Sequence, residues 1–185
     1  MKIAVSGAAG TGKSTLGRAL SQRLGVPYLE EGMRRRLEAG LDLHQLSHAR
    51  HQALAEELLD ELLEAADAAV AGHGGFVSDR CPLDMAAFWL YYRFAFDLEA
   101  TDRYMHRVRE SLPQFRDVVL LPRDGLALED DGVRSANPWV QLHFDALLEA
   151  MVARAGDGVR IHRLPAHCRA LEERVDWVLE AVGAG

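Results

Sequence analysis

Short apolar segments alternate with longer segments of helical periodicity along the whole chain. The apolar segments, at 2–6, 26–30, 76–78, 117–121 and 159–162, are predicted to be strands. Between them, apolar residues recur every three or four positions, which indicates amphipathic helices. Alternating strands and helices are typical of a parallel sheet that helices cover on both faces. The pattern therefore predicts an α/β protein, and a length of 185 residues suits a single domain over 1–185.

Capping residues and glycines indicate where the predicted helices begin and end. The longest is expected over about 43–71, because Asp42 and Gln45 form a capping pair and glycines follow it. Pro82 suits the first turn of a helix over 82–96. Asn137 and Pro138, a cap and a first-turn residue, open a later helix. The other helices are expected to begin near 14 and to cover 31–38, 99–111, 137–156 and 169–182.

Composition narrows the class of protein. Hydrophobic residues make up 49% of the chain and charged residues 26%, as in globular proteins. No apolar run approaches the roughly 20 residues of a membrane span, and the first strand is too short for a secretory signal, so a cytoplasmic protein is expected. Cys81 and Cys168 do not suggest a disulfide framework. The net charge of −7 disfavours a nucleic-acid partner, and a homodimer is left open.

Residues 7–14 form a complete G-x-x-x-x-G-K-S phosphate-binding loop between the first strand and the first helix. Glycines let backbone N–H groups close around phosphate oxygens, and the helix that follows presents its positive dipole end. Lys13 places a charge on the β- and γ-phosphates, and the Ser14 hydroxyl can bind Mg²⁺. The residues predicted to bind the nucleotide are Gly7, Gly10, Thr11, Gly12, Lys13, Ser14 and Thr15.

Two charged residues follow the third predicted strand. Asp79 is placed to bind Mg²⁺ together with Ser14, although an aspartate that only caps the next helix is the simpler alternative. Many ATP-hydrolysing proteins carry a glutamate at the following position, where this chain has Arg80. A guanidinium cannot activate water, but it can hold phosphate oxygens. This favours transfer to an acceptor over hydrolysis, unless Arg80 forms a structural ion pair.

Glu30, Glu31 and Arg34 follow the second predicted strand. A carboxylate at this position can accept the proton of an attacking hydroxyl, and Glu31 is the favoured candidate. Arg34 could bind an acceptor phosphate or steady that carboxylate; a solvated helix end is the alternative. Further along, Gln52 could hydrogen-bond a base or an amide. The nearby His44, His48 and His51 follow helical spacing, and a plain surface stripe is favoured for them.

The polar stretch around 123–137 follows the fourth predicted strand. Its length and position suit a mobile lid over the phosphates, with Arg123 and Arg134, and Arg134 could stabilise charge on the transferred group. A surface loop is the alternative. The aromatic residues Trp139, Phe144 and Trp177 are predicted to fill the core.

Together these residues resemble small P-loop kinases, the nicotinamide riboside kinase-like proteins within the wider deoxynucleoside and thymidylate kinase group. Besides the loop, Glu31-Gly32-Met33-Arg34, Ser78-Asp79-Arg80 and Asp131-Gly132-Val133-Arg134 match family motifs. The resemblance implies an ATP–Mg²⁺ donor, a nucleoside-like or nucleotide-like acceptor, and the strand order 2-3-1-4-5. Gly32 stands where the family has an aromatic residue, which predicts a wider acceptor pocket.

The leading hypothesis is therefore an ATP-dependent small-molecule kinase that uses Lys13, Glu31, Asp79, Arg80 and Arg134, with Glu31, Arg34, Gln52 and Arg80 near the acceptor. The alternative is a regulatory ATPase or nucleotide switch. A GTPase is disfavoured because the chain has no Asn-Lys-x-Asp motif and no Asp-x-x-Gly after the third strand. A polynucleotide kinase is disfavoured by the acidic charge.

Overall fold

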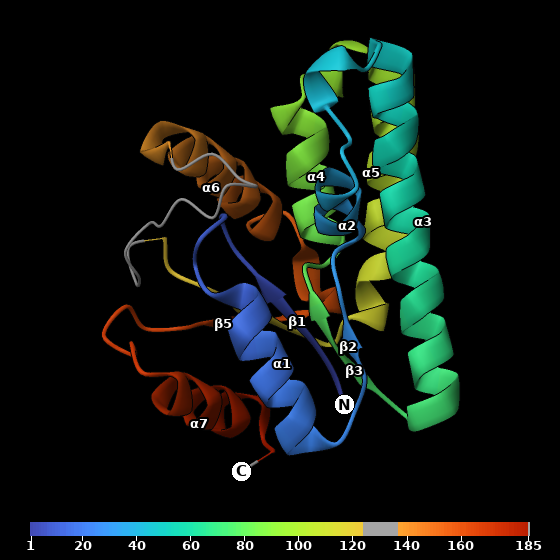
Figure 1. Cartoon of the computed structure of the whole chain (residues 1–185). Helices are drawn as coiled ribbons and strands as arrows, with labels where there is room; N and C mark the ends of the chain where they lie inside the picture. The colour runs from blue at the N-terminus through green and yellow to red at the C-terminus, as the bar shows by residue number, and fades with distance from the viewer. Residues whose placement is uncertain (124–136, 185) are drawn as a thin grey trace.

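Five parallel strands form the central sheet of the computed structural model, which describes residues 1–123 and 137–184. The strands are β1 (Lys2–Ser6), β2 (Tyr28–Leu29), β3 (Phe76–Asp79), β4 (Asp117–Leu120) and β5 (Arg160–Arg163). Their order is β2-β3-β1-β4-β5 and all four pairings are parallel, which confirms the expected fold class and order (Figure 1). The carboxyl ends of β1 and β3 therefore meet at one edge of the sheet, where ligands bind in such folds.

Two hydrophobic clusters hold helices on opposite faces of the sheet (Figure 1). One face carries α1 (Lys13–Leu24) and α7 (Leu171–Val182), which pack on Ile3 and Val5 of β1. The other face carries α3 (His48–His73), α4 (Pro82–Tyr91), α5 (Leu98–Ser111) and α6 (Pro138–Val152), with Ala4 of β1 in its cluster. Alternate residues of β1 thus point to opposite clusters, as strand geometry requires.

The long helix begins later than the sequence indicates. Asp42 and Gln45 do pair through their side chains, at 2.9 Å, but they belong to a 3₁₀ turn, Leu43–Gln45. The cap of α3 is Ser47, whose hydroxyl accepts from the Arg50 amide. The short α2 (Gly32–Glu38) comes just before this region. The predicted start of this helix at about 43 is therefore wrong. Ser47 caps α3, so the helix begins at His48.

The predicted helix over 82–96 is also divided. Pro82 begins α4 as expected, but α4 ends at Tyr91 and a 3₁₀ turn, Phe94–Phe96, follows. Arg93 between them has φ +67°, a left-handed conformation that no helix can continue through. The break turns the chain from α4 into α5.

The aromatic predictions have mixed outcomes. Phe144 is buried, as expected, and Trp177 packs partly buried against the cluster of α1 and α7. Trp139 is 74% exposed, so its assignment to the core is wrong. It lies in the first turn of α6, directly after the helix-opening Asn137 and Pro138. Within the described residues, no helix is both long and apolar enough to cross a membrane.

Candidate active site

The loop between β1 and α1 has the backbone that its glycines permit. Gly7, Gly10 and Gly12 have φ values of 144°, 76° and 78°, which side-chain-bearing residues rarely adopt. A Cβ atom on Gly7 would also lie 3.2 Å from the Leu121 carbonyl oxygen. The sequence Gly7–Ser14 therefore forms a tight loop at the edge of the sheet, as predicted.

Lys13 is almost completely buried, and its ammonium donates to the Ala8 carbonyl at 2.6 Å. The Thr11 hydroxyl donates to the same oxygen at 2.9 Å. A buried ammonium held against the loop lies where the motif requires a charge for phosphate oxygens. The loop thus combines backbone N–H groups with one fixed cation.

Ser14 and Asp79 come together across the loop, as the sequence predicts for a Mg²⁺ site. The Ser14 hydroxyl donates to Asp79 Oδ2 at 2.6 Å, and the Tyr28 hydroxyl donates to the same atom at 3.1 Å. Oδ1 of Asp79 is buried and has no hydrogen-bond partner among the residues that the structure describes. Burial by itself would raise the pKa of Asp79, but Lys13, Arg80 and the two hydroxyl donors lower it below its ordinary value.

A hydroxyl, an ionised carboxylate and a buried oxygen that still lacks a partner suit a hard cation such as Mg²⁺. Asp79 does not cap α4, whose cap position is Cys81, so the simpler alternative for Asp79 is excluded. No cluster of three or more His, Cys, Asp or Glu side chains suits a metal in the described part of the chain. A cation here would therefore take its other ligands from phosphates and water, as Mg²⁺ commonly does with nucleotides.

Arg80 is buried in the centre of the site, with its backbone at φ +81°. Its Nε donates to Glu31 Oε1 at 2.6 Å, and its Nη1 donates to Asp84 Oδ1 at 3.0 Å. Nη1 also lies 3.3 Å from the Gly7 carbonyl oxygen, and the guanidinium packs over the Phe88 ring at 4.6 Å. Burial alone would lower the pKa of Arg80, but the two carboxylates raise it above its ordinary value.

Asp84 holds this ion-pair network to β1 and α4. It is completely buried, and its Oδ2 accepts from the Ser6 hydroxyl at 2.5 Å and from the Cys81 amide at 3.0 Å. Ser6 is the last residue of β1, directly before the phosphate-binding loop. The network Glu31–Arg80–Asp84 therefore connects the loop to the carboxylate that the sequence nominates as a base. Asp84 and Ser6 were not foreseen, because a buried capping aspartate resembles any other helix-start residue.

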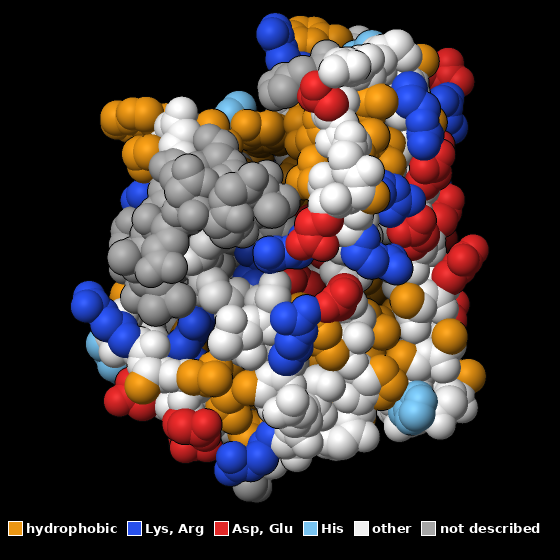
Figure 2. All heavy atoms as spheres, viewed as in Figure 1, with side chains coloured by type: hydrophobic (Ala, Val, Ile, Leu, Met, Phe, Trp, Pro, Cys, Tyr) orange, Lys and Arg blue, Asp and Glu red, His pale blue; other side chains and the backbone are white. Residues whose placement is uncertain are grey.

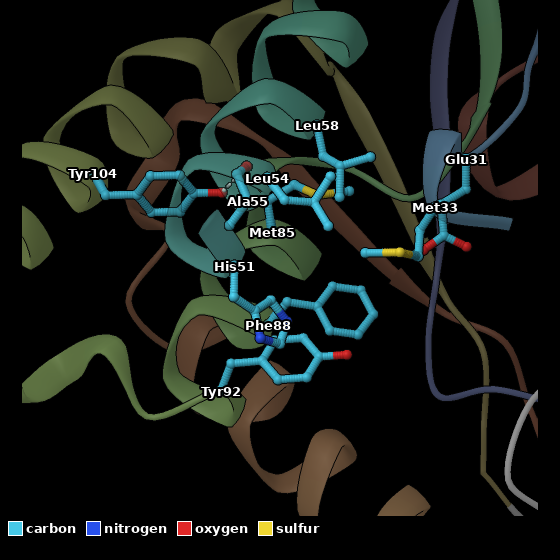
Figure 3. Close-up of a pocket in the computed structure, with 10 residues that line it drawn as sticks. All are labelled: Glu31, Met33, His51, Leu54, Ala55, Leu58, Met85, Phe88, Tyr92 and Tyr104. Atoms are coloured by element: carbon cyan, nitrogen blue, oxygen red, sulfur yellow. Dashed lines mark hydrogen bonds between the residues drawn. The ribbon is translucent and has the colours of Figure 1, made fainter. Parts of the chain in front are cut away.

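A largely apolar pocket opens beside Glu31, between α2, α3, α4 and α5 (Figure 3). Figure 3 shows Glu31 and Met33 at one end of the pocket and Tyr104 at the other. The remaining lining residues are His51, Leu54, Ala55, Leu58, Met85, Phe88 and Tyr92. Its aromatic and apolar lining with few polar groups suits a flat ring.

In contrast to the apolar pocket, the face that carries the loop has many charged side chains. Figure 2 shows basic and acidic side chains together in the hollowed middle of this face, and further charged side chains along the α3 edge. Glu57 and Glu61 of α3 form ion pairs with Arg50 and Arg36. The polar centre of the site therefore lies next to the apolar pocket.

The histidines of the α3 region do not behave alike. His48 is exposed and contacts Phe94 edge-on, with ring centroids 5.1 Å apart, in line with a surface residue. His51 lines the pocket, its ring lies 4.2 Å from that of Tyr92, and its Nε2 is buried without a partner. Burial, with a smaller effect of His48, lowers the pKa of His51. The expectation of a surface stripe is therefore wrong for His51.

Several predicted residues are not gathered into this site. Arg34 forms an exposed ion pair with Glu38 at 2.9 Å and does not line the apolar pocket. Gln52 is adjacent to His51 but is not a lining residue either. Glu30 pairs with Arg18 at the surface. Arg134, with most of the predicted lid, lies outside the described residues.

The sequence suggests that Gly32 widens the acceptor pocket, whereas the structure shows Gly32 at the contact between α2 and α3. A Cβ atom at this position would lie 2.7 Å from Glu61 Oε2 and 3.1 Å from Leu58 Cδ2. Gly32 therefore allows α2 to approach α3 closely. The apolar side chains of the pocket itself carry no signal in the sequence, because core residues of α3 and α4 follow the same periodicity.

The fold and the loop define a P-loop nucleotide-binding protein. The chain belongs to the AAA domain family, whose pattern its sequence matches over residues 2–174. A comparison with curated proteins finds no match.

Among solved structures, the fold is similar to that of small P-loop kinases. Deoxyadenosine kinase from M. mycoides with bound dATP is 15% identical, with a TM-score of 0.65 over 99% of this chain and 100% of that one. NadR protein in complex with NR is 22% identical, with a TM-score of 0.72 over 99% of this chain but only 52% of that one. Shikimate kinase from Aquifex aeolicus is 16% identical, with a TM-score of 0.58 and full coverage of both chains. The resemblance to this group of folds is thus confirmed.

Proposed function

We propose that the protein is an ATP-dependent kinase that transfers the γ-phosphoryl group to a hydroxyl of a small molecule bound in the apolar pocket. The observation that carries this proposal is the position of Glu31. Its carboxylate lines the pocket and is held by Arg80, which also contacts the Gly7 carbonyl of the loop. A carboxylate between an apolar pocket and a phosphate-binding loop is where a general base for transfer is needed.

In the proposed reaction, the acceptor hydroxyl gives its proton to Glu31 and its oxygen attacks the γ-phosphorus. The bond from that phosphorus to the β–γ bridging oxygen breaks, and ADP leaves with the electron pair. Lys13 balances the charge that develops on the phosphoryl oxygens. Arg80, which the sequence nominates as a phosphate ligand, acts in this proposal mainly by orienting Glu31.

Ser14 and Asp79 are proposed to hold Mg²⁺. When bound, the ion supplies positive charge to the β- and γ-phosphate oxygens. The low pKa of Asp79 keeps its carboxylate ionised for this role, and Tyr28 fixes the orientation of the carboxylate. Arg34 and Gln52 do not line the pocket, so this proposal gives them no acceptor contact there, and Arg134 stays a prediction of the sequence.

The acceptor class follows from the pocket lining. Leu54, Leu58, Phe88 and Tyr92 offer apolar and aromatic surfaces, and His51 Nε2 is a buried hydrogen-bonding atom. This favours a flat ring with one polar edge, as in a nucleoside-like molecule, over a polyol acid. Deoxyadenosine kinase and NadR, whose structures hold dATP and NR, have comparable folds.

A regulatory ATPase is the second candidate, because the sequence belongs to the AAA domain family. Against it, the residue after Asp79 is an arginine buried in ion pairs, which cannot activate water.

A screen for ADP release separates the two candidates. Purified protein with ATP and Mg²⁺ is tested alone and with nucleosides, nucleoside monophosphates, shikimate and aminoglycoside-like alcohols. We expect ADP release to rise with a nucleoside-like acceptor. Release that is appreciable without an acceptor and unchanged by the panel would support the ATPase and contradict the kinase.

A further inference from the structure

The carbonyl groups of the phosphate-binding loop are held by side chains from distant parts of the chain. Gln141 of α6 donates to the Ala9 carbonyl. Arg174 of α7 donates from Nη2 to the Thr11 carbonyl at 2.8 Å, across 163 positions of sequence. Neither contact belongs to the loop motif, so both are additions of the tertiary fold.

Arg174 is an unusual residue for the core. It is 4% exposed, and its Nε is buried without a hydrogen-bond partner. In the described part of the chain no carboxylate forms an ion pair with it, in contrast to Arg80, which has two. Burial lowers the pKa of Arg174, and a smaller effect of Cys168 opposes it.

We propose that Arg174 is a positioning residue for the nucleotide: from α7 it holds the Thr11 carbonyl away from the phosphate cradle, and its charge, which no carboxylate of the described residues pairs, favours an anion in the loop. This inference rests only on the nucleotide-binding part of the proposed function.

The geometry of the peptide group supports the first half of the proposal. The carbonyl of Thr11 and the N–H of Gly12 belong to one trans peptide, so they point in opposite directions. A guanidinium that fixes the carbonyl on the α7 side therefore directs the Gly12 N–H toward the other side, where phosphate oxygens are bound. Fixing this peptide beforehand removes part of the ordering cost of binding.

The charge of Arg174 supports the second half. Burying a cation without a partner costs free energy, and a fold normally avoids it. A triphosphate in the adjacent loop would supply the missing negative charge, so part of the cost is recovered only when nucleotide binds. A purely structural arginine would instead be expected to pair with a carboxylate of its own helix or of a neighbour.

The test is to compare Arg174→Met with Arg174→Lys by calorimetric titration of ATP–Mg²⁺. Methionine keeps the aliphatic bulk but removes the donor and the charge; lysine keeps the charge and one donor. We expect the Kd for ATP to rise about tenfold or more in Arg174→Met, with most of the loss recovered in Arg174→Lys. Kd values of the wild type and of Arg174→Met that agree within twofold would overturn the proposal.

Arg23→Met is the matched control. Arg23 also reaches α7, through an exposed pair with Asp176 at 3.6 Å, but it lies at the far end of α1 from the loop. We expect its Kd for ATP to equal that of the wild type. A loss as large as in Arg174→Met would show that any weakened α7 contact has this effect, and would overturn the proposal.

A third variant covers the case in which Arg174→Met does not fold. Arg174→Gln keeps a hydrogen-bond donor without the charge, so its Kd is expected to exceed that of Arg174→Lys several-fold. Equal affinities in the two variants would contradict the role of the charge. Failure of the wild type itself to bind ATP would instead contradict the proposed function.

Discussion

The phosphate-binding loop and the apolar pocket meet at Glu31, but they are built from different kinds of structure. The loop is eight consecutive residues whose backbone N–H groups form the phosphate cradle. The side chains of Lys13 and Thr11 support it by donating hydrogen bonds to the Ala8 carbonyl. The pocket is built almost entirely from side chains, contributed by α2, α3, α4, α5 and the turn after α4. The residues of the loop are therefore adjacent in sequence, whereas the residues that line the pocket come from separate helices.

The contrast extends to charge. The loop side holds a buried ammonium and two buried guanidinium groups, Lys13, Arg80 and Arg174, of which Arg80 is paired with Glu31 and Asp84. The pocket side holds apolar and aromatic groups with one half-buried histidine, His51. The first arrangement suits a polyanion and the second an uncharged ring. The comparison therefore agrees with the proposed function, in which the loop binds the donor and the pocket binds the acceptor.

The largest expected effect comes from the donor side. Lys13→Met should reduce kcat by about 10²-fold to 10³-fold, because it removes the cation that balances developing charge. The fold should persist, since the hydrogen bond that Lys13 donates goes to a carbonyl of its own loop. Initial rates of acceptor phosphorylation and thermal unfolding measure the two quantities. Lys2→Met changes the other lysine of the chain, serves as the control and should keep wild-type rates. Equal losses of rate in both variants would contradict the role of Lys13 in balancing the developing charge.

A second large effect is expected where the two regions meet. Glu31→Gln should lower kcat by about 10²-fold or more, because the amide cannot accept the proton. Asp84 still pairs with Arg80, so ATP binding and folding should remain near wild type. Stopped-flow or steady-state kinetics with calorimetry separate these quantities. Glu30→Gln removes a neighbouring surface carboxylate and should leave kcat unchanged. A Glu31→Gln variant of full activity would eliminate Glu31 as the base.

On the acceptor side, the expected effect is on binding alone. Met33→Phe places a rigid ring at one end of the pocket, next to Glu31. We expect the KM for the acceptor to rise about tenfold while the KM for ATP stays the same, because the loop lies outside the pocket. Met105→Phe, on α5 and outside the lining, is the control. A rise in the KM for ATP that matches the rise in the KM for the acceptor would contradict the separation of the ATP site from the acceptor pocket.

The smallest effect concerns pH. Burial lowers the pKa of His51 in the folded protein, so the unfolded chain takes up the proton more readily. The contribution of His51 to stability is therefore full above its unfolded pKa of about 6.5 and is lost as the pH falls below that value. Thermal unfolding between pH 7.5 and 5.5 should show a fall of about 1–2 °C that His51→Phe lacks. An identical pH profile in the variant would contradict the burial argument.

Much of the donor side could be predicted from the sequence because its signals are local. The G-x-x-x-x-G-K-S run is contiguous, and the flanking strand and helix have distinct periodicities. Asp79 and Glu31 were found by the same reasoning, since each follows a strand of a parallel sheet. The fold class needed only the alternation of strands and helices, and the strand order came from the resemblance to known kinases.

The acceptor side could not be predicted in the same way. Leu54, Leu58 and Met85 occupy positions that the periodicity assigns to a core, and nothing local shows that a cavity lies between them. Arg34 and Gln52 were placed near the acceptor from helical spacing, and the structure puts both outside the lining. Trp139 was assigned to the core by residue type alone and is exposed. Each of these outcomes depends on how helices pack, which residue type and spacing do not encode.

What the sequence determined by itself is the chemistry that a short backbone segment can carry: the phosphate-binding loop, its lysine and its serine. Only the tertiary structure decided which distant groups complete that loop. It joined Glu31 to Asp84 through Arg80, left Asp79 Oδ1 without a partner, and brought Arg174 to the Thr11 carbonyl. The physical reason is the range of the interactions. Glycine torsions and a following helix act within a few residues, whereas burial and ion pairing depend on contacts that the chain makes only after folding.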